Sequence, residues 1–105
     1  MSYYRPLPDS LTIKKSKIEG LGLFASKDVP KGTNLGVSHR SETSDDYFQD
    51  NDYIRTPLGG FVNHSKKPNC EFIWKWYGFD LCTLEDIEEG EELTAIYTLY
   101  DPEYL

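Results

Sequence analysis

Short runs in which apolar and polar residues alternate indicate a chain built mainly of β-strands. Residues 11–14 follow the two-residue period of a half-buried strand. Helical periodicity is weak, and only the acidic segment 44–54 is expected to hold one or two helical turns, which Pro57 would end. Four further strands are predicted over residues 20–25, 71–76, 79–83 and 92–97, and the middle two are joined as a hairpin at Tyr77 and Gly78.

One pattern occurs twice along the chain. Residues 28–35 and 86–93 share the order Asp, Val or Ile, two variable positions, Gly, two variable positions and Leu. We expect each branched residue to enter the core, and Gly32 and Gly90 to adopt the positive φ of a tight turn before a new strand. The repeat therefore predicts two similar turn-and-strand units in a mostly β domain.

Length and composition predict one folded domain spanning residues 1–105. A chain of this length has room for a single core, and 38% hydrophobic with 14% aromatic residues is too apolar for a disordered chain. The longest stretch without Asp, Glu, Lys or Arg, residues 56–65, is about half of what a membrane span needs. Because the first residues also lack the pattern of a secretory signal, we expect an intracellular protein, cytoplasmic or, in a eukaryotic host, nuclear.

The formal net charge of −7 is concentrated in two acidic regions. Residues 76–105 carry nine acidic side chains and no Lys or Arg, and residues 41–53 carry five acidic side chains and again no base. Nucleic acid is therefore not an expected direct ligand, since phosphate binding requires clustered Lys and Arg. A basic protein partner fits this charge, and so does a surface whose acidic groups serve solubility alone.

The two cysteines, Cys70 and Cys82, are expected to be core thiols in a reducing compartment and not to form a disulfide. Taken in order with His39 and His64, they are separated by 24, 5 and 11 intervening residues, which matches no standard zinc spacing. No metal site is predicted.

Three segments form motifs in a fixed order along the chain: residues 20–25, residues 63–65 with 68–70, and residues 90–94 with Tyr97. Together they resemble the motifs of the SET domain, the fold of S-adenosylmethionine-dependent protein lysine methyltransferases. The resemblance covers about residues 11–100 and implies a single SET domain of small curved sheets. It also implies a C-terminal pseudoknot that brings the middle motif beside the last one.

The resemblance implies a binding site for S-adenosylmethionine made from the first two motifs. Gly20, Leu21 and Gly22 would pass close to its methionine end, where Leu21 contributes main-chain groups and a Cβ in place of a glycine hydrogen would clash. Asn63 would bond the amino-acid portion, and His64 would lie at the adenine, largely through its backbone. Without the resemblance, the glycines fit a plain bend, and Asn63 and His64 fit ordinary buried polar groups.

The catalytic residues that the resemblance implies are Tyr97 and Tyr53. The hydroxyl of Tyr97 would orient the reacting groups at the point of methyl transfer, and Tyr53 would line an aromatic channel for the lysine. Such a channel lowers the pKa of the lysine amine by desolvation, which matters because deprotonating an ordinary lysine at pH 7 costs roughly 4 to 5 kcal/mol. Tyr100 and Tyr104 are the aromatic candidates for stacking on adenine. By position alone, each of these tyrosines also fits a packing role.

The sequence also departs from the family pattern. Gly60, Lys66 and Thr98 stand where many members have Arg, Cys and Gly. Neither a pre-SET region nor a zinc-binding post-SET lid is recognised in the 105 residues. The expected domain is therefore a minimal SET domain.

Together these features favour a protein lysine methyltransferase that acts on a basic protein, histone-like or otherwise rich in lysine. The alternative is a catalytically silent SET-like module that binds a basic peptide or partner through its acidic surface. Aromatic residues such as Trp74, Trp76 and Tyr77 are candidates for a homodimer contact, because a small core leaves few places to bury them.

Overall fold

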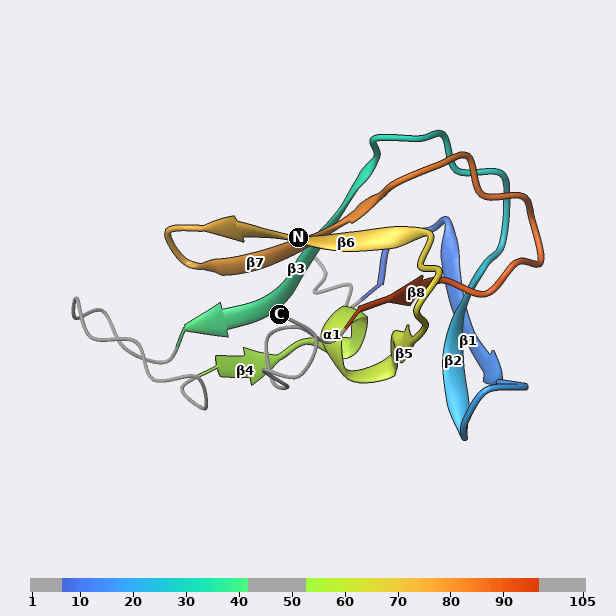
Figure 1. Cartoon of the computed structure of the whole chain (residues 1–105), viewed down its shortest axis with the longest axis horizontal. Coiled ribbons are helices and arrows are strands. Elements are labelled where there is room, and N and C mark those ends of the chain that lie inside the picture. Colours follow the sequence, from blue (N-terminus) through green and yellow to red (C-terminus); the bar gives the residue numbers. More distant parts are fainter. Residues whose placement is uncertain (1–6, 42–52, 97–105) are drawn as a thin grey trace, which may run out of the picture.

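Small β-sheets make up most of the fold, as predicted (Figure 1). The computed structural model describes residues 7–41 and 53–96. Along these residues the elements are β1 (Leu11–Lys15), β2 (Leu21–Ala25), β3 (Asn34–Ser41), β4 (Tyr53–Arg55), α1 (Pro57–Phe61), β5 (Asn63–His64), β6 (Cys70–Lys75), β7 (Gly78–Thr83) and β8 (Thr94–Ala95).

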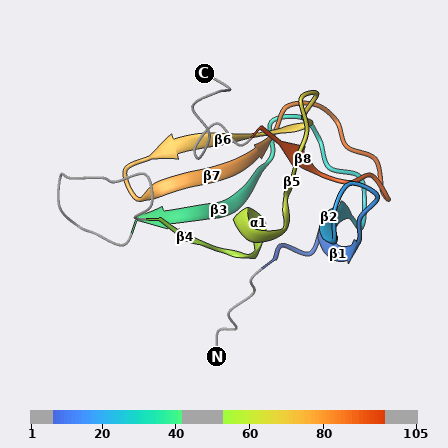
Figure 2. The ribbon, with the colours of Figure 1, turned by 60° about the horizontal axis from the view of Figure 1, so that its bottom comes forward.

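The strands form three separate sheets. β1 and β2 form an antiparallel hairpin, β4, β3, β7 and β6 form a four-stranded antiparallel sheet in that order, and β5 pairs in parallel with β8. Figure 2 shows the four strands side by side, with the β1–β2 hairpin at the end of the molecule opposite the β6–β7 turn. The parallel pair places the middle motif beside the C-terminal segment, as the resemblance implies.

Strands β6 and β7 confirm the predicted hairpin, with a turn one residue earlier than expected. Lys75 pairs with Gly78, so the two loop residues are Trp76 and Tyr77. Gly78 has a φ of 144°, and a Cβ at this position would overlap the backbone carbonyl of His39 on β3. Glycine is required here because two strands approach each other closely at their backbones.

Helix α1 corrects the prediction for the segment around Pro57. This proline is the first residue of the helix, whereas the sequence pattern made it the end of one. Proline suits the first helical turn because the N–H that it lacks would have no partner within the helix. Of the segment expected to be helical, residues 53–54 belong to β4, so the prediction is wrong there, and residues 44–52 lie outside the described residues.

The repeated pattern forms two turns that pair with each other. Val29 and Ile87 exchange two backbone hydrogen bonds of 2.8 Å, and both side chains are buried. Gly32 and Gly90 have φ values of 81° and 92°, which confirms the predicted turns. The strand after the second turn, β8, is shorter than the expected 92–97. It holds two residues, and the segment before it bonds to β2.

The core lies between the two hairpins and the paired turns. Its fully buried hydrophobic side chains include Leu23 of β2, Leu81 of β7, and Ile87 and Leu93 of the C-terminal turn. Across residues 7–41 and 53–96, no helix has the length and apolar character needed to cross a membrane.

Candidate cofactor site

The C-terminal segment that leads into β8 is held by three neighbours. The Leu93 N–H donates to the Leu23 carbonyl at 2.8 Å on one side, and β8 pairs with β5 on the other. Asn69 holds the same segment through its side chain. Its Nδ2 donates to the Glu92 carbonyl at 2.9 Å, and its Oδ1 accepts the Thr94 N–H at 2.8 Å. The first, middle and last motifs therefore meet at one place.

A polar cluster lies at this meeting point. Asn63 Nδ2 donates to Glu92 Oε2 at 2.8 Å and lies 3.0 Å from Ser16 Oγ. The Ser16 hydroxyl lies 2.8 Å from both carboxylate oxygens of Glu92 and accepts the Ile18 N–H at 2.9 Å. Asn63, Glu92 and Ser16 are all half-buried. The carboxylate of Glu92 is thus the central acceptor of the cluster.

Gly22 is buried directly against this carboxylate. A Cβ on Gly22 would overlap Glu92 Oε2 and would lie 3.1 Å from Asn63 Nδ2. Its φ is not positive, so glycine is needed for the close approach and not for an unusual backbone conformation. A Cβ at this position would therefore meet the protein's own polar cluster. The clash with the methionine end of the cofactor stays a prediction.

Gly20 and Leu21 direct main-chain groups toward the cluster. Gly20 has a φ of 49° in the loop that leads into β2, and its carbonyl accepts the Ser16 N–H at 2.8 Å. The carbonyls of Glu19 and Leu21 lie 3.2 and 3.5 Å from Asn63 Nδ2. Leu21 is 52% exposed. A main-chain role for Leu21 stays a prediction that this geometry fits.

His64 lies next to Asn63 in β5 and is half-buried. It pairs with Ala95 of β8, and the following residue, Ser65, donates its N–H to the Ala95 carbonyl at 3.1 Å. The backbone of the middle motif is thereby fixed to the C-terminal segment. The position of His64 at an adenine stays a prediction.

The predicted tyrosines lie at or beyond the limits of the described chain. Tyr97, Tyr100 and Tyr104 are outside the described residues. Tyr53 begins β4, where its backbone pairs with Ser41, and its side chain is also outside the described part. Their catalytic and cofactor roles stay predictions.

Glu92 and Ser16 are the cluster residues that sequence reasoning missed. Glu92 belongs to the last motif but received no role, and Ser16 belongs to none of the three motifs. The two residues are 76 positions apart, and Glu92 is 29 positions from Asn63. No local pattern signals such a contact, because it depends on how distant segments meet.

Both cysteines are free thiols, but only Cys70 lies in the core as predicted. Cys70 is buried, and desolvation raises its pKa to about 12. Burial also raises the pKa of Cys82, which is half-buried. Neither is therefore poised as a nucleophile. Among the residues that the structure describes, no three His, Cys, Asp or Glu side chains gather to hold a metal ion.

His39 is a core residue of the four-stranded sheet. It is fully buried, and its ring lies edge-on to Phe72 and Phe79, with centroids 5.0 and 6.1 Å away. Its Nδ1 lies 2.9 Å from the hydroxyl of Ser38. Desolvation, and secondarily the charge of Arg55, lowers its pKa from 6.5 to about 4.

Acidification is expected to destabilise the fold through His39. The unfolded chain takes up a proton on this residue below about pH 6.5, whereas the folded chain does so only near pH 4. Stability that is present above pH 6.5 is therefore lost as the pH falls toward 4. Between pH 7 and pH 5 we expect a loss of about 2 kcal/mol in the free energy of unfolding, measured by urea denaturation.

His39→Gln is the control for this prediction. Glutamine keeps a polar side chain but does not titrate in this range. All other side chains are the same in both proteins, so the difference between the two pH slopes isolates His39. Identical slopes for variant and wild type would contradict the prediction.

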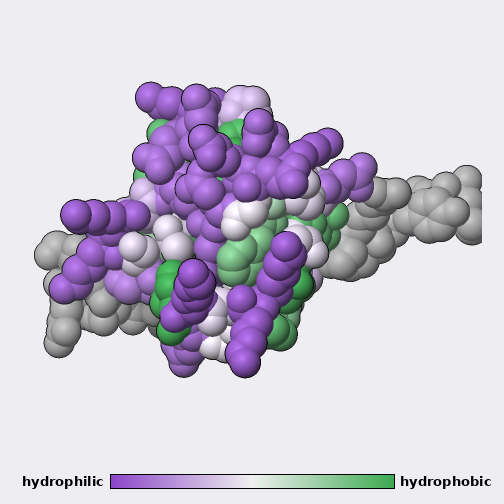
Figure 3. Space-filling model, turned by 90° about the vertical axis from the view of Figure 1, so that its right-hand side faces the viewer, coloured by the Kyte–Doolittle hydropathy of each residue, from purple (hydrophilic) through white to green (hydrophobic). Residues whose placement is uncertain are grey.

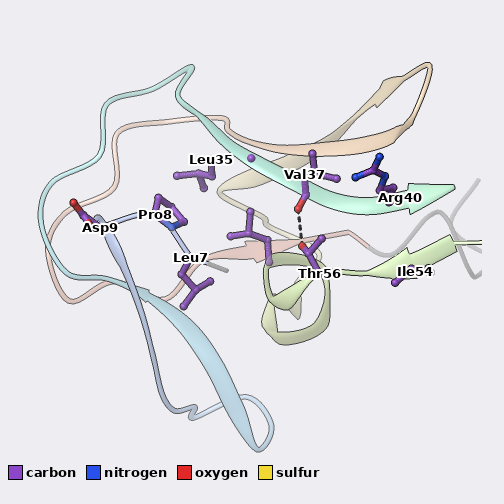
Figure 4. A pocket seen from close by; sticks show the side chains of 10 residues that line it. Leu7, Pro8, Asp9, Leu35, Val37, Arg40, Ile54 and Thr56 are labelled. Atoms are coloured by element: carbon purple, nitrogen blue, oxygen red, sulfur yellow. Dashed lines mark hydrogen bonds between the residues drawn. The ribbon is translucent and has the colours of Figure 1, made fainter. Parts of the chain in front are cut away.

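A cavity of about 620 Å³ lies apart from the polar cluster (Figure 4). Residues 7–9, β3, β4 and α1 line it, mainly with apolar side chains, and Arg40 lies at one end. The Thr56 hydroxyl donates to the Val37 carbonyl at 2.6 Å in its wall. Of the predicted site residues whose side chains the structure describes, none lines this cavity.

Most of the surface on the side of the β1–β2 hairpin is hydrophilic, with small hydrophobic areas (Figure 3). Ile18 and Leu21, in the connection between the two strands and at the start of β2, are 51% and 52% exposed. The backbone N–H of Ile18 donates to the Ser16 hydroxyl, and the backbone carbonyl of Leu21 lies 3.5 Å from Asn63 Nδ2. Apolar surface therefore borders the polar cluster.

Comparisons with known proteins agree on one fold. A family model described as the SET domain matches residues 20–98. A crystal structure of a Plasmodium falciparum protein, named as a candidate histone methyltransferase, superposes with a TM-score of 0.66 at 20% identity and covers 86% of this chain and 94% of that one. The methyltransferase domain of human PR domain-containing protein 2 superposes with a TM-score of 0.65 at 17% identity, covering 85% and 77%. The curated proteins contain no match.

Proposed function

The chain belongs to the SET domain family, and on this premise we propose that it transfers the methyl group of S-adenosylmethionine to the ε-amine of a lysine in a basic protein. The observation that carries the proposal is the polar cluster of Asn63, Glu92 and Ser16 beside Gly22, where all three motifs meet. The net charge of −7 supports a basic protein as the substrate.

The polar cluster fits the amino-acid end of S-adenosylmethionine. That end carries an ammonium group and a carboxylate, so a site for it needs both acceptors and donors. The Glu92 carboxylate and the carbonyls of Glu19 and Leu21 are acceptors, and the Asn63 amide provides both functions. Hydrogen bonds between an ammonium and a carboxylate are among the stronger ones in proteins. When bound, the cofactor supplies an electrophilic methyl group on its sulfonium.

The task left to the protein is to present lysine as a neutral amine. Deprotonation at pH 7 costs roughly 4 to 5 kcal/mol for a lysine in water, and an aromatic channel lowers this cost by desolvating the ammonium form. We assign Tyr53 to the wall of this channel and Tyr97 to the orientation of the amine. Tyr97 is the second residue after β8, whose partner strand β5 carries Asn63. Once the lysine amine is neutral, its alignment with the methyl group matters more than acid or base catalysis.

S-adenosylhomocysteine is expected to raise the melting temperature of the protein, because a ligand at 100 times its Kd adds about 2.7 kcal/mol to stability. Asn63→Ala should weaken binding by about 10- to 100-fold. Removing one partner from a half-buried polar cluster costs about 1 to 3 kcal/mol, since the remaining groups lose their hydrogen bonds. Isothermal titration calorimetry measures both affinities.

Asn34→Ala is the matched control, because it removes the same amide from another part of the fold. Asn34 lies at the start of β3, where its Nδ2 donates to Asp80 Oδ2 at 2.9 Å. This variant should bind the ligand as the wild type does. Wild-type protein that shows no binding at millimolar ligand would contradict the proposal. Binding without methyl transfer to mixed histones would favour the silent module.

A further inference from the structure

Strand β6 is an edge strand of the four-stranded sheet. Its inner side pairs with β7, and none of the described strands pairs with its outer side (Figure 2). With six residues it is twice as long as β4, the opposite edge. The N–H and C=O groups of every second residue on such an edge point away from the neighbouring strand, on the side where a further strand pairs.

The end of this strand carries two of the most exposed large hydrophobic side chains in the described residues. Trp74 is 60% exposed and Trp76, in the adjoining turn, is 79% exposed. Since a tryptophan buries up to about 250 Å², these two side chains leave roughly 350 Å² of largely apolar surface on each copy. Phe72, Trp74 and Trp76 alternate along the chain, so Phe72 and Trp74 lie on one face of the sheet and lead toward Trp76. Phe72 itself packs against the core.

Residues 70–76 form a sequence that is complementary to itself when reversed. The order is Cys, Glu, Phe, Ile, Trp, Lys, Trp, with Ile73 at its centre. Glu71 and Lys75 are equally distant from that centre, and so are Phe72 and Trp74. In a two-fold interface the same surface of both copies is in contact, so if residue i faces residue j of the partner, residue j also faces residue i. A sequence that is complementary about its centre allows two identical edges to pair in this way.

We infer that two copies of the chain associate by antiparallel pairing of β6 with the partner's β6 about a two-fold axis at Ile73. In this register Glu71 faces the partner's Lys75 on one face of the sheet, and Phe72 faces the partner's Trp74 on the other. The result is a continuous sheet of eight strands, four from each copy.

Charge selects this register over its neighbours. An axis at Phe72 sets Lys75 opposite the partner's Asn69, and an axis at Trp74 sets Lys75 opposite the partner's Ile73. Only the axis at Ile73 pairs the acidic residue with the basic one, and symmetry makes that pair twice. Opposite charges on directly facing residues stabilise an antiparallel pair, and like charges destabilise it.

The contact area sets the expected strength. Two copies of the exposed indole surface, with the backbone and side chains of a six-residue strand, bury on the order of 1,000 Å², near the lower limit for a specific interface. The dimer should therefore dissociate on dilution, with a Kd in the micromolar range. It does not depend on methyl transfer, so its failure would leave the proposed function untouched.

Sedimentation velocity between about 1 and 200 µM tests the inference. The wild type is expected to shift from monomer to dimer over this range. Glu71→Lys and Lys75→Glu should each raise the Kd by at least about tenfold, because each sets like charges opposite each other twice. The double variant restores opposite charges in exchanged positions and should dimerise again. Trp74→Ser should dissociate the dimer without any change of charge.

Matched charge changes outside β6 serve as controls. Lys27, which directly precedes the first repeated turn, and Glu89, in the second, are exposed, so Lys27→Glu and Glu89→Lys should leave the dimer unchanged. Melting temperatures show that every variant is folded. A wild type that remains monomeric at 200 µM would overturn the inference. So would a dimer insensitive to the single charge reversals, or a double variant that stays monomeric.

Discussion

Tyr97→Phe is expected to lower the turnover of methyl transfer by about 10- to 1000-fold, which corresponds to about 1.4 to 4 kcal/mol of barrier. The change keeps the aromatic ring and removes only the hydroxyl that we propose orients the reacting groups. Cofactor affinity should change by no more than about threefold, because the hydroxyl stabilises the transition state more than the bound cofactor. Methyl incorporation into histones, titration with S-adenosylhomocysteine and the melting temperature are measured on the same protein.

Tyr77→Phe is the matched control for this prediction. Tyr77 lies in the β6–β7 turn, and its hydroxyl donates to the carboxylate of Asp80 at 2.7 Å, outside the polar cluster. Turnover should stay at the wild-type level in this variant. A packing role for Tyr97 predicts lower stability with unchanged turnover per folded molecule. Full activity of Tyr97→Phe would contradict both the site assignment and the mechanism.

Gly22→Ala is expected to weaken the binding of S-adenosylhomocysteine by at least about 100-fold, or about 2.7 kcal/mol. The new Cβ would overlap Glu92 Oε2 and stand 3.1 Å from Asn63 Nδ2. The carboxylate is the end of a flexible side chain, so it must move away from Ser16 and Asn63. The cluster then loses its central acceptor, and the melting temperature should fall as well. Calorimetry and thermal denaturation measure the two effects.

Gly60→Ala is the matched control, because it adds the same methyl group at a position where the methyl group meets no other atom. No heavy atom lies within 4 Å of a Cβ built on Gly60, which is exposed in the last turn of α1. Binding should be unchanged, and stability should be equal or higher by up to about 1 kcal/mol. If Gly22→Ala binds the ligand as tightly as the wild type, the polar cluster is not the cofactor site.

Local patterns were sufficient to predict the β6–β7 hairpin, and they predicted the strands β1 and β2 without their pairing. Strands β1, β2, β6 and β7 lie where the alternation of apolar and polar residues predicted them. Their partners are near in the sequence, so the residues that form each pair stand in one short segment. The repeated turns were also predictable, because Gly32 and Gly90 take a backbone conformation that few other residues adopt.

Local patterns failed where a neighbour distant in the sequence decides the conformation. The same rules allow a proline to end one helix or to begin another. Pro57 begins α1, which packs against β2, β3 and β4. Asn69 binds the segment before β8 through its side chain, and Leu93 bonds to β2, so little of the expected strand 92–97 pairs as β8. These contacts depend on long-range closure of the chain.

The sequence by itself determined the mostly β fold, the three motifs and their order, and so the family. It did not determine which of four similar glutamates, Glu88, Glu89, Glu91 or Glu92, belongs to the site. In the structure, the first three are exposed, whereas Glu92 is half-buried against Ser16, Asn63 and Gly22. Burial of Leu93 and its bond to β2 set the orientation of that segment, and the meeting of three distant segments selects one carboxylate. Only tertiary packing supplies that information, because hydrogen-bond partners 29 and 76 positions away leave no local pattern.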